Sequence, residues 1–368
     1  MEKFCVFCGS RPVSKTMEHV IPQWLIECTG DPNRKVQFGV NLETGKLMQY
    51  SFNDFMFPAC RSCNITFSTL ESKAKSIITD VLRETSLAAI SLNTLFTWFD
   101  KVRIGLWLAY LVLNKNRYGI EPHFYIQQRM DANDRMLLVY KCSDNTKGIQ
   151  FIGVNLPFFS FVPSCFSLAI NQFYFINISA DFLFSRRLGL PSPKEMFLQN
   201  DGKIGITMEM GLKRVLLPLV RCSYDQNCTE IYQPIIKPEI FNSGLGLYKN
   251  HYAKKYFHGF SSPIGKVLIK HKDNIRDYSK MAGEAWIPQK VFERNKLSKI
   301  VTTQVINFQN HLLNNIGNLD ELNFEIKRFW KRFIPQCKKF NKRMLERIDK
   351  EGLSEKHRRE NRKIRKIM

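Results

Sequence analysis

The sequence is short of acidic residues. Against 55 Lys and Arg it carries 33 Asp and Glu among 368 residues, which gives a formal charge of +22 at pH 7. A balance of this kind says little about fold, but it makes polyanions the leading class of partner. The alternative is a basic protein whose lysines are simply solvated.

Long apolar runs are also missing. Residues 104–113 are apolar but too few to cross a bilayer, and residues 158–184 are interrupted by Pro163, Asn171, Gln172, Asn177 and Asp181. The first residues show no secretory signal pattern. We therefore expect a cytoplasmic protein without a membrane partner. No internal repeat and no glycine-rich phosphate loop is present either.

Ten cysteines are present, and they fall into two groups. Six are scattered, as is typical of reduced thiols in an intracellular protein: Cys28, Cys142, Cys165, Cys222, Cys228 and Cys337. The other four form two C-x-x-C pairs, Cys5/Cys8 and Cys60/Cys63. Two such pairs supply four thiolates for a tetrahedral Zn²⁺, and a closed Cys₄ shell predicts a structural ion.

Between the pairs stands Glu18-His19-Val20-Ile21-Pro22, and Asn64 follows the last cysteine directly. Residues 18–21 are expected to form a short strand or its end, and Pro22 a helical start. Alternation over residues 36–50 predicts a hairpin. Residues 65–85 and 89–114 read as helices, and Glu71 lies two turns after Asn64, on nearly the same side.

From residue 118 to 269, aromatic and β-branched runs such as Phe124-Tyr125-Ile126 alternate with turn residues, which predicts a mixed or antiparallel sheet. From residue 285 onward the pattern is helical. The fold class expected is α+β, with units at residues 1–88, 89–284 and 285–368.

Basic residues gather in several places that suit nucleic-acid binding. Residues 325–368 hold 17 Lys and Arg against 6 Asp and Glu, a net +11, and we expect Pro335 to kink or split that helix. The candidate phosphate contacts are Arg61, Lys254, Lys255, Arg358, Arg359, Arg362 and Lys363. A solvated charged tail and an ordinary surface segment at residues 248–258 are the plainer alternatives.

The combined pattern C-x-x-C, Glu18-His19-Val20-Ile21-Pro22, C-x-x-C-Asn64 and Leu70-Glu71 resembles the ββα-metal, or HNH, endonucleases with a Cys₄ zinc. The resemblance covers about residues 1–90. It implies His19 as the general base, Glu18 and Asn64 as catalytic residues that ligate Mg²⁺ or Mn²⁺, and Glu71 as a further ligand. Neutral imidazole suits a base near pH 7, and hard ions prefer oxygen ligands.

One family feature is absent. The position of the asparagine that many members carry before the second pair is Phe55, with Asn53 nearby. His19 therefore either lacks that orienting partner or takes one from a backbone carbonyl.

The resemblance implies hydrolysis of DNA to 5′-phosphate ends, in defence against invading DNA or in a homing or restriction role. The alternative is a zinc-knuckle module that binds nucleic acid without cutting it. Formation of homo-oligomers, and the need for a protein partner or activator, stay open.

Overall fold

The computed structural model describes residues 4–40, 47–114, 120, 122, 124–198, 204–209, 217–222, 227–237, 251–259, 262–314 and 324–367. The statements that follow concern these residues.

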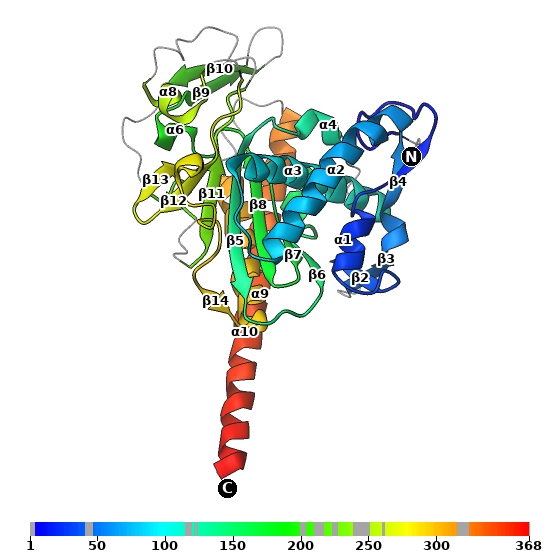
Figure 1. The fold of residues 1–368 in the computed structure, drawn as a ribbon, viewed down its shortest axis with the longest axis vertical. Coiled ribbons are helices and arrows are strands. Elements are labelled where there is room, and N and C mark those ends of the chain that lie inside the picture. Colours follow the sequence, from blue (N-terminus) through cyan, green and yellow to red (C-terminus); the bar gives the residue numbers. More distant parts are fainter. Residues whose placement is uncertain are drawn as a thin grey trace.

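An eight-stranded sheet forms the centre of the molecule (Figure 1). Its strands run in the order β13-β12-β11-β5-β8-β7-β6 with antiparallel neighbours, and β14 pairs with the end of β5 in parallel. Their bounds are β5 (Asp134–Cys142), β6 (Ile149–Ile152), β7 (Cys165–Ile170), β8 (Phe173–Ala180), β11 (Thr229–Gln233), β12 (Leu268–His271), β13 (Asn274–Asp277) and β14 (Val291–Phe292). The expected α+β class with a sheet-rich middle is confirmed.

Helices cover both faces of this sheet, because its strands carry apolar side chains on both sides. On β8, Phe173 and Phe175 share a core with α3 (Ala89–Leu113), whereas Tyr174 and Ile176 share a core with α9 (Arg294–Asn314). Helix α10 (Phe324–Ile367) packs against α9 and then extends beyond the rest of the molecule (Figure 1). The result is a layered arrangement with α3 buried along most of its length.

The N-terminal segment adds a smaller layer outside α3. It contains β1 (Thr16–His19), α1 (Gln23–Cys28), the hairpin β2 (Lys35–Val40) and β3 (Leu47–Ser51), η1 (Phe52–Phe55), β4 (Met56–Ala59) and α2 (Arg61–Leu82). Its apolar residues join the core that α3 shares with the sheet. The division into units at residues 88 and 284 stays a prediction.

Shorter elements complete the described chain. They are α4 (Ile126–Arg129), α5 (Pro157–Phe161), α6 (Ser185–Leu188), the paired β9 (Ser192–Leu198) and β10 (Ile204–Glu209), α8 (His251–Tyr256) and η3 (Tyr278–Lys280).

Most predicted elements are present, with three differences. The helical pattern expected from residue 285 begins only at Arg294, because Val291–Phe292 pairs with the end of β5 as strand β14. Phe124-Tyr125-Ile126 is not a strand: Phe124 stacks on Trp107, and Tyr125 precedes α4 and packs on Phe4. Helix α10 continues through Pro335, so the proline does not split it; packing of Phe333 and Cys337 on both sides of it supports the helix there. No described helix is long and apolar enough to cross a membrane.

Candidate metal centre and acid–histidine site

A strand–strand–helix unit carries the candidate site. Strand β1 pairs antiparallel with β4, so that Glu18 lies opposite Phe57 and His19 opposite Met56. Helix α2 begins two residues after β4, with Cys60 as its N-cap. The Val6 amide donates to the Pro58 carbonyl at 2.9 Å, which attaches the first cysteine pair to β4.

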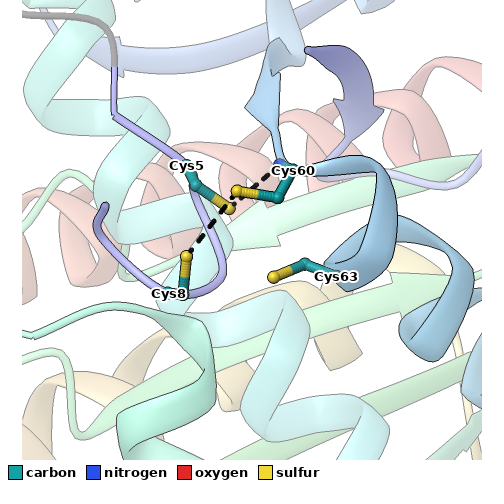
Figure 2. A group of neighbouring side chains, drawn as sticks. All are labelled: Cys5, Cys8, Cys60 and Cys63. Atoms are coloured by element: carbon teal, nitrogen blue, oxygen red, sulfur yellow. Dashed lines mark hydrogen bonds between the residues drawn. The ribbon is translucent and has the colours of Figure 1, made fainter. Parts of the chain in front are cut away.

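The four paired cysteines form one cluster. Their Sγ atoms all lie within 4.8 Å of one another, and Cys8 Sγ lies 4.0 Å from Cys60 Sγ. Figure 2 shows the four sulfur atoms directed toward a common centre. Gly9 closes the first turn with a φ of +79°, a conformation that glycine adopts without strain, and its amide donates to the Cys5 carbonyl.

This cluster fits a structural zinc. Tetrahedral Zn–S bonds of about 2.3 Å place the sulfurs about 3.8 Å apart, close to the spacing seen here. Two backbone amides, those of Val13 and Cys60, point at cysteine sulfurs at 3.4 and 3.3 Å, as suits thiolates. The predicted Cys₄ group is thus brought together, consistent with a structural zinc ion.

Glu18 and Glu71 are also brought together, but by a buried lysine. Lys101 Nζ lies 2.7 Å from Glu18 Oε1 and donates to Glu71 Oε1 as well. Its side chain is 1% exposed. Burial opposes the charge of Lys101, but Glu71 and Glu18 outweigh it and raise the pKa of the ammonium group. Burial raises the pKa of Glu18, and Lys101 counteracts that effect in part.

Glu71 accepts two more hydrogen bonds. Trp24 Nε1 donates to it at 3.0 Å and Trp98 Nε1 at 3.2 Å, from α1 and α3. With three donors around it, this carboxylate joins three helices, and its role as a ligand to a second ion stays a prediction. The Glu18 carboxylate, by contrast, forms no hydrogen bond in the described structure other than that from Lys101.

His19 is half-buried at the end of β1. Burial and then the Lys101 charge lower the pKa of the imidazole, which keeps it neutral near pH 7. Its Nδ1 is buried and has no partner among the described residues. The carbonyl of Phe55, at the position of the missing asparagine, accepts from the Val20 amide instead, and Asn53 is exposed.

Asn64 lies in the first turn of α2, one turn from Cys60. Its Nδ2 donates to Thr16 Oγ1 at 3.2 Å and to the Met17 carbonyl at 3.4 Å. These bonds hold the amide against β1, on the strand that carries Glu18 and His19, and leave its carbonyl oxygen as an available acceptor.

Of the predicted phosphate contacts, the side chains of Arg61, Lys254 and Lys255 are described, and they lie on two separate helices. Arg61 is exposed at the start of α2. Its backbone amide donates to the Val13 carbonyl, and this bond holds the loop that carries exposed Arg11 and Lys15 near the start of α2. Lys254 and Lys255 are exposed on α8, which lies far from α2 (Figure 1). For Arg358, Arg359, Arg362 and Lys363 the structure describes the helical backbone alone.

The sequence reasoning missed Lys101, Trp24 and Trp98. A signal for Lys101 was present: Asp100, Lys101 and Arg103 interrupt an otherwise apolar helix, and charged residues at such positions are almost always paired. The role of Trp98 as a donor has no sequence signature, because core packing explains a tryptophan there equally well.

Comparison of the chain with protein-family models, with curated proteins and with solved structures finds no match. Within the described ranges, no group of three or more His, Cys, Asp or Glu side chains other than the Cys₄ cluster is arranged to share a metal ion.

We predict that Cys60→Ser removes zinc and destabilises the N-terminal unit. Structural zinc binds with on the order of 10 kcal/mol, and that free energy is lost with a ligand. Zinc content by mass spectrometry and the unfolding midpoint measure the effect. The control is Cys28→Ser, a half-buried thiol outside the cluster that donates to the Leu25 carbonyl. Full zinc content in Cys60→Ser would contradict the assignment.

We also predict that Lys101→Met lowers the free energy of unfolding by about 3–5 kcal/mol, since it leaves two buried carboxylates without their cation. The matched control is Lys141→Met, which breaks an ion pair with Glu84 that is 21% and 34% exposed and should cost under about 1 kcal/mol. Urea unfolding compares the two. Equal losses would show that Lys101 does not neutralise the pair.

Proposed function

We propose that this chain is an HNH-type endonuclease that hydrolyses phosphodiester bonds in DNA, with His19 as the general base. The observation that carries the proposal is the position of His19. It lies at the end of β1 in a β1–β4–α2 unit cross-braced by the cysteine cluster, half-buried, with a lowered pKa and an unpartnered Nδ1.

The surroundings support this chemistry. A neutral imidazole accepts a proton from water, whereas an imidazolium does not. The exposed Arg11, Lys15 and Arg61, together with the N-terminus of α2, put positive charge beside β1 and β4, which favours a phosphate there.

The proposal includes a catalytic Mg²⁺ or Mn²⁺, but with fewer protein ligands than the family resemblance implies. The Glu18 carboxylate and the Asn64 carbonyl oxygen retain acceptor capacity and would hold the ion; Glu71 would not, because three donors occupy it. An ion with two protein ligands keeps several waters, as is common for Mg²⁺. When bound, it would stabilise negative charge on the phosphate.

The second candidate is a zinc-knuckle module that binds nucleic acid without cutting it. The Lys101 ammonium favours this reading, since it neutralises carboxylates that would otherwise attract a metal ion. One substitution, at His19, and one cleavage assay separate the two candidates.

We predict that His19→Ala abolishes cleavage of plasmid DNA while zinc content, folding and DNA affinity stay at the wild-type level. Loss of a general base typically costs about 10²–10⁴-fold in rate. Cleavage is followed on gels with Mg²⁺, Mn²⁺ and EDTA.

The control for this experiment is His271→Ala, a half-buried histidine on β12. Cleavage by His19→Ala at the wild-type rate would refute the assignment. Intact DNA binding without cleavage by any of the proteins would favour the binding module.

We predict further that a chain ending after Lys350 binds DNA more weakly. The truncation removes seven Lys and Arg against three Glu, while it keeps the buried α10 residues Phe333, Cys337 and Asn341. The slope of log affinity against log salt should fall by about 0.9 for each phosphate that the tail no longer neutralises. Lys254→Gln/Lys255→Gln tests α8 in parallel. An unchanged slope after truncation would exclude the tail from DNA binding.

A further inference from the structure

A second site lies away from β1. A cavity of about 760 Å³ opens between α3, α4, α5, the end of β8 and the two C-terminal helices. This volume is within the roughly 300–1,000 Å³ range of small-molecule sites. Exposed Gln128 and Asp181 belong to its lining, so the cavity reaches the surface.

The cavity combines cationic and aromatic walls. Arg103 and Arg129 supply the cations, and the aromatic side chains are Phe124, Phe158, Phe161 and Trp330. Asp181, the acidic residue of the lining, pairs with Lys237 at 2.9 Å. Arg103 is paired with Asp100, whereas Arg129 has no ion pair among the described residues and adds positive charge to the wall.

Polar atoms in the cavity wall lack partners. Arg103 is 1% exposed; its Nη1 donates to Asp100 and Asn177, but its Nε has no partner among the described residues. Ser179 is 2% exposed, and its Oγ is likewise unpartnered within the described chain. A buried polar atom without a hydrogen bond costs about 1–3 kcal/mol, and a ligand in the cavity would supply the missing partners.

The guanidinium group of Arg129 is available to bind an anion. Its guanidinium stacks on the Phe124 ring at 4.1 Å and forms no hydrogen bond or ion pair in the described part of the chain. Burial lowers the pKa of Arg129; Asp181 opposes this effect, and Arg103 adds to it. Two guanidinium groups thus repel each other across one cavity, and an anion between them would remove that repulsion.

We propose that this cavity binds a nucleotide, with its phosphate at Arg103 and Arg129 and its base against Phe161 and Trp330. Guanidinium groups bind phosphate oxygens in a fork, and an aromatic ring stacks on any base. Gln128 Oε1 accepts from the Tyr125 amide, and its Nε2 is left to donate to a heteroatom of a base or sugar. Free phosphate would leave most of the volume empty, and a purely apolar ligand would leave Arg103 Nε and the Ser179 hydroxyl without partners. The proposal does not depend on nuclease activity.

Titration calorimetry on the full chain tests it, with AMP, UMP, adenosine and inorganic phosphate as probes. We expect AMP and UMP to bind, and adenosine and phosphate each to bind at least tenfold more weakly. Arg129→Met and Trp330→Leu should each weaken AMP binding at least tenfold. Arg276→Met, an exposed arginine on β13, should leave it unchanged.

His19→Ala distinguishes the cavity from the candidate nuclease site, since AMP affinity should be unaffected there. Circular dichroism verifies that each variant is folded. The proposal is overturned if neither nucleotide binds at millimolar concentration, if phosphate binds as well as AMP, or if Arg129→Met and Trp330→Leu both retain wild-type affinity. Affinity lost in His19→Ala but kept in Arg129→Met would also overturn it.

Discussion

The candidate site is built around a cluster of four cysteines positioned to bind one metal ion. Strands β1 and β4 have four residues each and pair only with one another, and an isolated two-stranded ribbon is marginally stable in water. The cysteine cluster joins the N-terminal turn to the end of β4 and the first turn of α2. A zinc ion bound by the cluster would hold these segments together, and the pairing of β1 with β4 would then hold His19 near α2.

Helix α3 connects this unit to the rest of the molecule. Most of its residues are buried because it lies between the N-terminal unit and the sheet. Two charged residues of α3 that are close in sequence face different neighbours. Lys101 contacts Glu18 and Glu71. Arg103 contacts Asn177 and lines the cavity. One helix thereby contributes a cation to each of two sites, and its apolar residues hold both sites on the same rigid element.

Local patterns in the sequence were sufficient to predict most of the helices, the hairpin, the sheet-rich middle and the cysteine cluster. One example is the start of α3 at Ala89, which neighbouring residues in the sequence determine. Another is the cysteine cluster, because zinc requires the four thiols that Cys5, Cys8, Cys60 and Cys63 supply at C-x-x-C spacing. Contacts between distant residues were not predictable in this way. Lys101 lies 83 residues from Glu18, and the early start of α2 at Arg61 follows from Cys60 as its N-cap. Phe124 and Tyr125 have strand propensity, but their contacts with Trp107 and Phe4 outweigh it.

The charges around Lys101 limit where a second ion fits. Two carboxylates and one ammonium leave a single negative charge, and burial raises the cost of any charge that is not matched. An ion placed between Glu18 and Glu71 would have to displace Lys101, whose stem is enclosed by α3's neighbours, and would leave that ammonium without a partner. In the proposed nuclease, an ion held by Glu18 and Asn64 would need no such displacement. The position of Lys101 is thus compatible with a divalent ion at Glu18 but not with one that bridges Glu18 and Glu71.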